Sequence, residues 1–129
     1  MFITKYDILI DTTHNNSATG IYFYSTGWPN GVVRAVQYVQ STANAVPTTG
    51  VLSLDVGSTL RPILTAVAAS TSWIRYPQGV ALDSTGALAT TALPVVFIPL
   101  SGEVALRLGL TGGTSAATTG LVSVYVEGN

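Results

Sequence analysis

Apolar and polar residues alternate along several segments of this chain, most regularly near its C-terminal end. In Glu103–Leu110 and in Leu121–Glu127 almost every second residue is aliphatic. Successive side chains of a strand point to opposite faces, so this period of two predicts strands with one buried face. Pro94–Pro99, a short apolar run bounded by prolines, predicts a further strand before them. We expect the three to be successive strands of a sheet whose outer face carries Glu103 and Arg107 as its fixed charges.

Further strands are predicted upstream from alternation or from aromatic and β-branched residues. They are Ile3–Asp11, Ile21–Tyr24, Val32–Gln40, Val51–Val56 and Trp73–Tyr76. In the first of these, Tyr6, Ile8 and Ile10 share the face expected to be buried. Ile63–Ala69 fits either a strand or one to two turns of helix.

Two features around residue 30 affect the prediction for the third segment. The pair Asn30-Gly31 is typical of a two-residue hairpin turn, because both positions of that turn favour a positive φ. The spacing in Val32–Gln40 also fits a helix, but four valines and a tyrosine favour a strand. The alternation then places Arg34, Val36 and Tyr38 on the face opposite Val33, Ala35, Gln37 and Val39.

These segments amount to about eight to ten short strands, with turn signals every 8–12 residues or so, which indicates an all-β sandwich or barrel. No segment of the 129 residues repeats another, and no linker divides them. We therefore expect residues 1–129 to form a single domain, which is large enough to bury a core without disulfides.

The charge content suggests that the surface is used for association. Only 9% of residues are Asp, Glu, Lys or Arg, against about 25% in typical soluble domains, and the net charge is -1. A nearly neutral surface with apolar patches promotes contact between proteins. A homo-oligomer or a stable docking site on a partner is the favoured interpretation. The alternative is a lone domain with an uncharged Ser/Thr-rich surface, as in some secreted binding modules.

Several classes of protein are disfavoured by composition. The five cations are scattered singly, so the sequence offers no basic stretch for nucleic acid. No apolar run approaches the roughly 20 residues of a membrane helix. The first residues lack the pattern of a signal peptide, which predicts synthesis in the cytoplasm. Cysteine is absent, so no thiolate metal site or disulfide is available.

The residue types that often act as catalytic groups or metal ligands do not form a catalytic pattern in this sequence. His14 is the only histidine, and its nearest carboxylates, Asp7 and Asp11, are too few for a metal site. Asp83 has the sequence context of a turn residue and Glu103 that of a charge at the start of a strand, rather than of paired catalytic acids. No serine lies in a nucleophile-elbow pattern. We expect no enzymatic activity, no cofactor and no metal.

The aromatic residues are more numerous than one face of a small core needs. Tyr22 and Tyr24 would be exposed together if Phe23 points inward, and exposed aromatics on one strand face bind sugar rings or protein partners. Trp73 is expected in the core. Trp28, in a Gly- and Pro-containing loop, is expected to be exposed at an interface.

The order of the segments, including Trp73-Ile74-Arg75-Tyr76-Pro77, the turn Asp83-Ser84-Thr85-Gly86 and the closing Gly120–Glu127 strand, resembles a known family. It is similar to the small jelly-roll cement, or decoration, proteins on the heads of tailed bacteriophages. The resemblance implies a single jelly-roll-like antiparallel β-sandwich that assembles as a homotrimer. It also implies a non-enzymatic virion protein that binds the major capsid protein on the outer capsid surface and stabilises capsomer junctions.

Under this hypothesis a few exposed residues are candidates for the capsid or oligomer interface. We expect Arg34, Arg61 and Arg75 to make polar contacts and Trp28 an apolar one, with Tyr76 beside them. The alternative hypothesis is a carbohydrate- or receptor-binding jelly-roll module of a phage head or tail, which would use the exposed tyrosines and tryptophans.

Overall fold

The structure is a computed structural model and describes residues 2–12, 21–44, 46, 49–56, 61–80, 95–101, 105–112 and 118–128. These residues form eleven strands and no helix. The strands are β1 (Phe2–Asp11), β2 (Ile21–Tyr24), β3 (Asn30–Gln40), β4 (Val51–Val56), β5 (Arg61–Ala68), β6 (Trp73–Arg75), β7 (Gln78–Val80), β8 (Val95–Phe97), β9 (Pro99–Ser101), β10 (Leu106–Thr111) and β11 (Thr119–Gly128). The segment at Ile63–Ala69, for which the sequence allowed a helix or a strand, is a strand: its residues up to Ala68 belong to β5.

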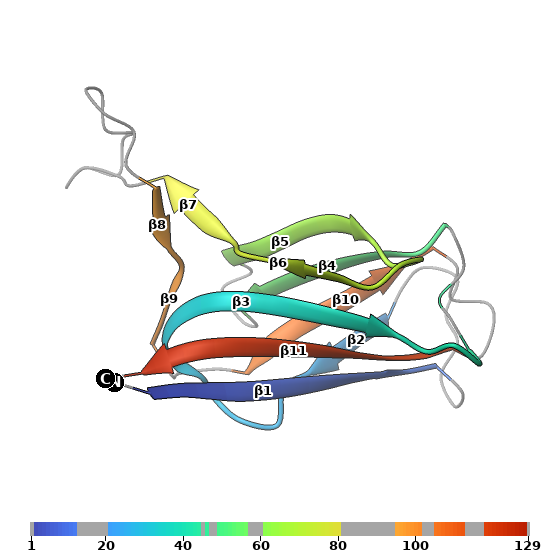
Figure 1. The fold of residues 1–129 in the computed structure, drawn as a ribbon, viewed down its shortest axis with the longest axis horizontal. Coiled ribbons are helices and arrows are strands. Elements are labelled where there is room, and N and C mark those ends of the chain that lie inside the picture. The colour runs from blue at the N-terminus through green and yellow to red at the C-terminus, as the bar shows by residue number, and fades with distance from the viewer. Residues whose placement is uncertain are drawn as a thin grey trace.

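Two antiparallel sheets pack face to face (Figure 1). Sheet A has the order β1-β11-β3-β6, with β9 also paired to β3, and sheet B has the order β2-β10-β4-β5. Strands from the two ends of the chain therefore lie side by side, and consecutive strands alternate between the sheets from β1 to β4. This is the strand order of a jelly roll, an architecture of two Greek keys. The expected fold, a single jelly-roll-like antiparallel β-sandwich, is confirmed.

The core lies between the sheets and follows the predicted alternation. In sheet A, Ile8 and Ile10 of β1 and Val122 and Val124 of β11 are fully buried. In sheet B, the alternate leucines of β4 and β10 meet them from the other side. The largest fully buried side chains are Tyr38, Ile8, Ile10, Leu52, Leu54, Leu106, Leu108 and Leu110. Burial of such aliphatic side chains is the main favourable term in folding.

Tyr38 joins the two sheets through the core. Its hydroxyl donates a hydrogen bond of 2.8 Å to the carbonyl oxygen of Ala69, which follows β5. Its ring lies 5.5 Å, centroid to centroid, from that of Trp73, whose indole N–H donates to the Ala68 carbonyl at 2.9 Å. Trp73 therefore packs against the core as predicted.

The expectation that the three closing segments form one sheet is wrong. β10 lies in sheet B between β2 and β4, whereas β11 lies in sheet A between β1 and β3. Arg107 therefore faces outward on sheet B, and Glu103 lies outside the described residues. Adjacency in sequence does not decide sheet membership in a jelly roll, because consecutive strands cross from one sheet to the other.

The predicted faces of β3 are right for Val36, Tyr38 and Val39 but wrong for Val33, because the strand contains a β-bulge. The register to β11 shifts between Tyr125 and Val126, so that Arg34 is an extra residue between the paired positions Val33 and Ala35. A bulge exchanges the faces of the residues that follow it. Val33 is consequently buried on the same side as Val36 and Tyr38.

Asn30-Gly31 forms no hairpin turn. Both residues are the first of β3 and pair with β9. Gly31 has a φ of 137°, and a Cβ there would collide with the carbonyl oxygen of Glu127. The glycine is required for close approach of two backbones rather than for a turn.

A two-stranded ribbon, β7 paired with β8, projects from the margin of the sandwich next to β6 and β9 (Figure 1). β8 corresponds to the strand predicted at Pro94–Pro99. The turn predicted at Asp83–Gly86 lies outside the described residues.

Candidate interaction surfaces

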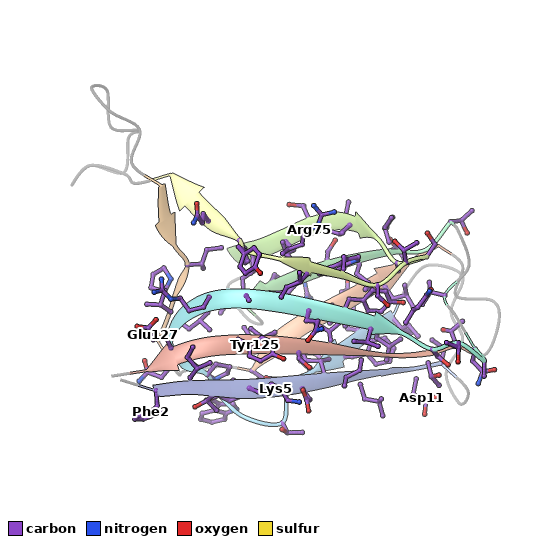
Figure 2. The ribbon with its side chains drawn as sticks, viewed as in Figure 1. Phe2, Lys5, Asp11, Arg75, Tyr125 and Glu127 are labelled. Atoms are coloured by element: carbon purple, nitrogen blue, oxygen red, sulfur yellow. The ribbon has the colours of Figure 1, made fainter. Side chains whose placement is uncertain are left out.

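The outer face of sheet A is the first candidate surface, and we call its apolar part the aliphatic face. It consists of Ile3, Leu9, Val39, Ile74 and Leu121. Leu9 of β1 is paired with Leu121 of β11, which is paired in turn with Val39 of β3, so these three side chains form a row across the sheet. Leu9 is 62% exposed. Figure 2 shows Lys5 on β1 and Tyr125 on β11 along this face, between Phe2 and Asp11 at the two ends of β1.

Two pairs of opposite charges lie on this face, together with the exposed carboxylate of Asp11. The Lys5 ammonium lies 3.7 Å from Asp7, whose carboxylate also accepts a hydrogen bond of 2.7 Å from the hydroxyl of Ser123. The Arg34 guanidinium, on the bulge of β3, lies 2.6 Å from the carboxylate of Glu127. Exposed pairs of this kind add little to stability. Their effect here is that the face carries almost no net charge.

The outer face of sheet B is the second candidate surface. Phe23 is half-buried and packs against the core, so its neighbours Tyr22 and Tyr24 point outward and are each 57% exposed. Tyr22 and Tyr24 are therefore exposed together, as predicted for the case in which Phe23 points inward. We call Tyr22, Tyr24, Arg107 and Asp55 the tyrosine platform.

Arg107 holds the platform in place. Its guanidinium donates two hydrogen bonds to the Asp55 carboxylate, at 3.1 Å and 2.9 Å, and its central carbon lies 4.2 Å from the centroid of the Tyr22 ring. The hydrogen bonds to Asp55 raise the pKa of the Arg107 guanidinium. Gly109 stands opposite Tyr22 and leaves room for the ring, because a Cβ there would come within 3.2 Å of it. The result is a fixed aromatic and cationic surface.

The predicted interface residues do not all lie together. Trp28, in the β2–β3 connection, is 68% exposed, and Tyr76, just after β6, is 63% exposed. Arg75 is exposed, with its guanidinium 6.0 Å from the Trp73 ring. Figure 2 shows Arg75 well apart from Glu127, the partner of Arg34. Arg61 begins β5, and its side chain lies outside the described residues.

Among the residues that the structure describes, no three His, Asp or Glu side chains gather as metal ligands. His14 and Asp83 lie outside those residues. The described chain also contains no helix long and apolar enough to span a membrane.

Sequence reasoning missed the pair of Asp55 and Arg107. Both residues point outward on strands that were correctly predicted, but the pairing depends on the register of β4 against β10. The alternation predicts which face of its strand each residue lies on. It does not predict which residue of the neighbouring strand stands opposite, and no local sequence signal does so here.

Comparison with known proteins does not extend this description, since no family model, curated protein or solved structure matches the chain.

Proposed function

We propose that this protein is a non-enzymatic structural protein of a bacteriophage virion, a cement or decoration protein. It binds the major capsid protein on the outer face of the head as a homo-oligomer and stabilises the junctions between capsomers. The observation that carries this proposal is the outer face of sheet A, which combines exposed aliphatic side chains with mutually neutralised charges.

The physical reason is the free energy of desolvation. Burying apolar surface contributes about 25 cal/mol per Å², whereas burying an unpaired charge costs several kcal/mol. On the aliphatic face Leu9 and Val39 are available for burial, and the neighbouring Lys5 and Asp7 are already paired. Such a surface docks on another protein at low electrostatic cost. Contacts with several capsomers at once would add by avidity, so that each contact alone can be modest.

The fold and three of the four described carboxylates agree with this proposal. Jelly rolls are common among viral capsid domains and lectins. Asp7, Asp55 and Glu127 each pair with a cation of the same chain. These carboxylates therefore have structural partners, rather than the converging arrangement that acid–base hydrolysis requires.

The test uses phage heads from which the protein has been removed. Purified protein is added back, unbound protein is washed away, and the temperature at which the heads release DNA is measured. We expect stoichiometric rebinding and a higher release temperature. Heads that were never stripped serve as the upper reference. Failure to rebind, or rebinding without a gain in heat resistance, would overturn the proposal.

A saccharide-binding module is the second candidate, and the tyrosine platform is the observation that favours it. Sugar rings stack on aromatic faces while charged side chains accept or donate hydrogen bonds to their hydroxyls. Tyr24 is exposed beside the paired Arg107 and Asp55, which supplies both elements.

A glycan array tests this second function. Binding to a set of related glycans that Tyr24→Ala abolishes and Tyr24→Phe retains would support it. A cement protein is expected to show no saccharide preference, and an array without signal would exclude the module.

A further inference from the structure

β1 is a long and regular edge strand. It runs for ten residues, and its register to β11 shows no shift. In the described part of the chain, β11 is its neighbour on one side and no strand pairs on the other. An uncovered edge of this length presents backbone donors and acceptors to another strand.

The opposite edge of the sandwich is different. β5, the outer strand of sheet B, has two register shifts against β4, contains Pro62, and holds Ala66 at a positive φ of 49°. Bulges and prolines are devices that protect an edge from pairing. The molecule therefore protects one edge and leaves β1 regular.

The hydrogen-bonding direction along β1 follows from one bond. The N–H of Thr12 donates to the carbonyl of Thr118 at 3.0 Å, in line with the register of the whole β1–β11 ladder. In an antiparallel ladder the hydrogen-bonded positions alternate. The even-numbered residues of β1 therefore bond to β11. The odd-numbered residues, among them Ile3, Lys5, Asp7 and Leu9, direct their N–H and C=O groups toward the open side.

We propose that β1 pairs antiparallel with β1 of a second copy of this chain around a two-fold axis at Tyr6. The sheets A of the two copies then become one continuous sheet. This inference is independent of the identity of the capsid partner.

The sequence of the strand selects this register. With Tyr6 opposite Tyr6, Lys5 stands opposite Asp7 of the second copy, twice by symmetry, and Ile3 stands opposite Leu9. Ile3, Lys5, Asp7 and Leu9 of each copy would exchange about eight backbone hydrogen bonds. Opposite charges and apolar pairs directly across a ladder are favourable, and like charges are unfavourable.

The two neighbouring two-fold registers are unfavourable because they place like charges opposite each other. A shift by one pair in one direction places Lys5 opposite itself and Ile3 opposite Asp7. A shift in the other direction places Asp7 opposite itself and Lys5 opposite Leu9. Both put like charges at the axis. The order apolar, positive, negative, apolar from Ile3 to Leu9 is thus complementary to itself with Tyr6 at the axis. An axis at Ile8 would also place Lys5 opposite Asp11, but it places Asp7 opposite Leu9 and leaves Ile3 without a partner in β1.

The first test measures association by sedimentation velocity over a range of concentrations. We expect a dimer for the wild type, and for Lys5→Asp a dissociation constant raised about tenfold or more, since two attractive pairs become repulsive. Lys5→Asp combined with Asp7→Lys restores complementarity and is expected to recover the dimer. Arg75→Asp, an equal change of charge on exposed β6, is the matched control and is expected to leave the dimer intact.

The second test fixes the register with single cysteines, which is straightforward because the chain contains none. Residues facing each other across a two-fold axis at a non-hydrogen-bonded pair are about 4.5 Å apart at Cα, within disulfide range. Tyr6→Cys is therefore expected to cross-link on mild oxidation faster than Lys5→Cys or Asp7→Cys. Thermal melts confirm that each variant is folded.

The remaining outcomes overturn the pairing. A monomer at all concentrations excludes it, and preferential cross-linking at residue 5 or 7 excludes the register. A trimer, which the resemblance to cement proteins implies, also excludes the two-fold pair but leaves the proposed function standing. Loss of capsid binding by a protein that still dimerises would instead overturn the function alone.

Discussion

The two outer faces of the sandwich differ in chemistry although the two inner faces are alike. Both sheets bury aliphatic side chains toward each other. Outward, sheet A carries Leu9, Leu121 and Val39 in a row with self-paired charges, whereas sheet B carries exposed tyrosines over an Arg–Asp pair. The alternation that builds the core says nothing about how the outer faces are used. That use has to be inferred from exposure and charge.

The edges of the sandwich differ in the same way. β1 is regular and open in the described part, whereas β5 is irregular and contains a strained residue. Sheet A can therefore be extended at β1 by a strand of another molecule without rearranging its own strands. Sheet B, whose edge strand β5 is irregular, is suited to contacts through the side chains of its outer face.

The largest expected effect is at Gly31 of sheet A. Gly31→Ala forces a Cβ against the backbone carbonyl of Glu127 at a φ of 137°, and is expected to lower the free energy of unfolding by about 3 kcal/mol. Gly109→Ala is the matched substitution in sheet B. A Cβ there comes within 3.2 Å of the exposed Tyr22 ring and no closer than 3.9 Å to the backbone, so the expected cost is about 1 kcal/mol. Urea denaturation measures both, and equal costs would contradict the assignment of Gly31 to a backbone contact.

The link between the sheets at Tyr38 is the next test. Tyr38→Phe removes the hydrogen bond to Ala69 and is expected to cost about 1 kcal/mol near neutral pH. Burial raises the pKa of Tyr38, so the folded state keeps this proton when the unfolded chain has lost it. The contribution of protonated Tyr38 to the free energy of unfolding is therefore fully present below the ordinary pKa of tyrosine, about 10. It is lost as the pH rises above that value. Urea melts between about pH 8 and pH 11 are expected to show a steeper loss for the wild type than for Tyr38→Phe. Parallel losses would refute the role of Tyr38.

The smallest expected effect is at the strained edge. Ala66→Gly removes the penalty for a Cβ at positive φ and is expected to raise the free energy of unfolding by about 0.5 kcal/mol. Ala68→Gly, at a regular position of the same strand, is expected to lower it by a similar amount. Thermal melts of the two variants distinguish them, and a loss of stability in both would argue against strain at residue 66.

The sequence predicted the core well where alternation is uninterrupted. β1, β10 and β11 bury the residues that the period of two selected, and the jelly-roll class is confirmed. It failed only at the start of β3, because one bulge at Arg34 exchanges the face of Val33 relative to the rest of the strand. It also failed at Asn30-Gly31, whose glycine serves a close backbone contact between strands distant in sequence.

The candidate surfaces were predicted only in part. The outward direction of Tyr22 and Tyr24 was expected on condition that Phe23 points inward, which it does. The row of Leu9, Leu121 and Val39 was not foreseen, because it depends on the sheet order and on two registers. Exposure of Trp28 agrees with the expectation for it, while its role at a capsid interface stays a prediction.

Heads stripped of the protein provide the measurement that tests the central claim most directly. The wild type, Val39→Lys on sheet A and Tyr24→Ala on sheet B are each added back, and the temperature of DNA release is recorded. Val39 is 47% exposed and Tyr24 57% exposed, so both variants are expected to fold. We predict that Val39→Lys abolishes the gain in heat resistance and that Tyr24→Ala retains it. Full protection by Val39→Lys together with loss of protection by Tyr24→Ala would contradict the assignment of sheet A as the docking face.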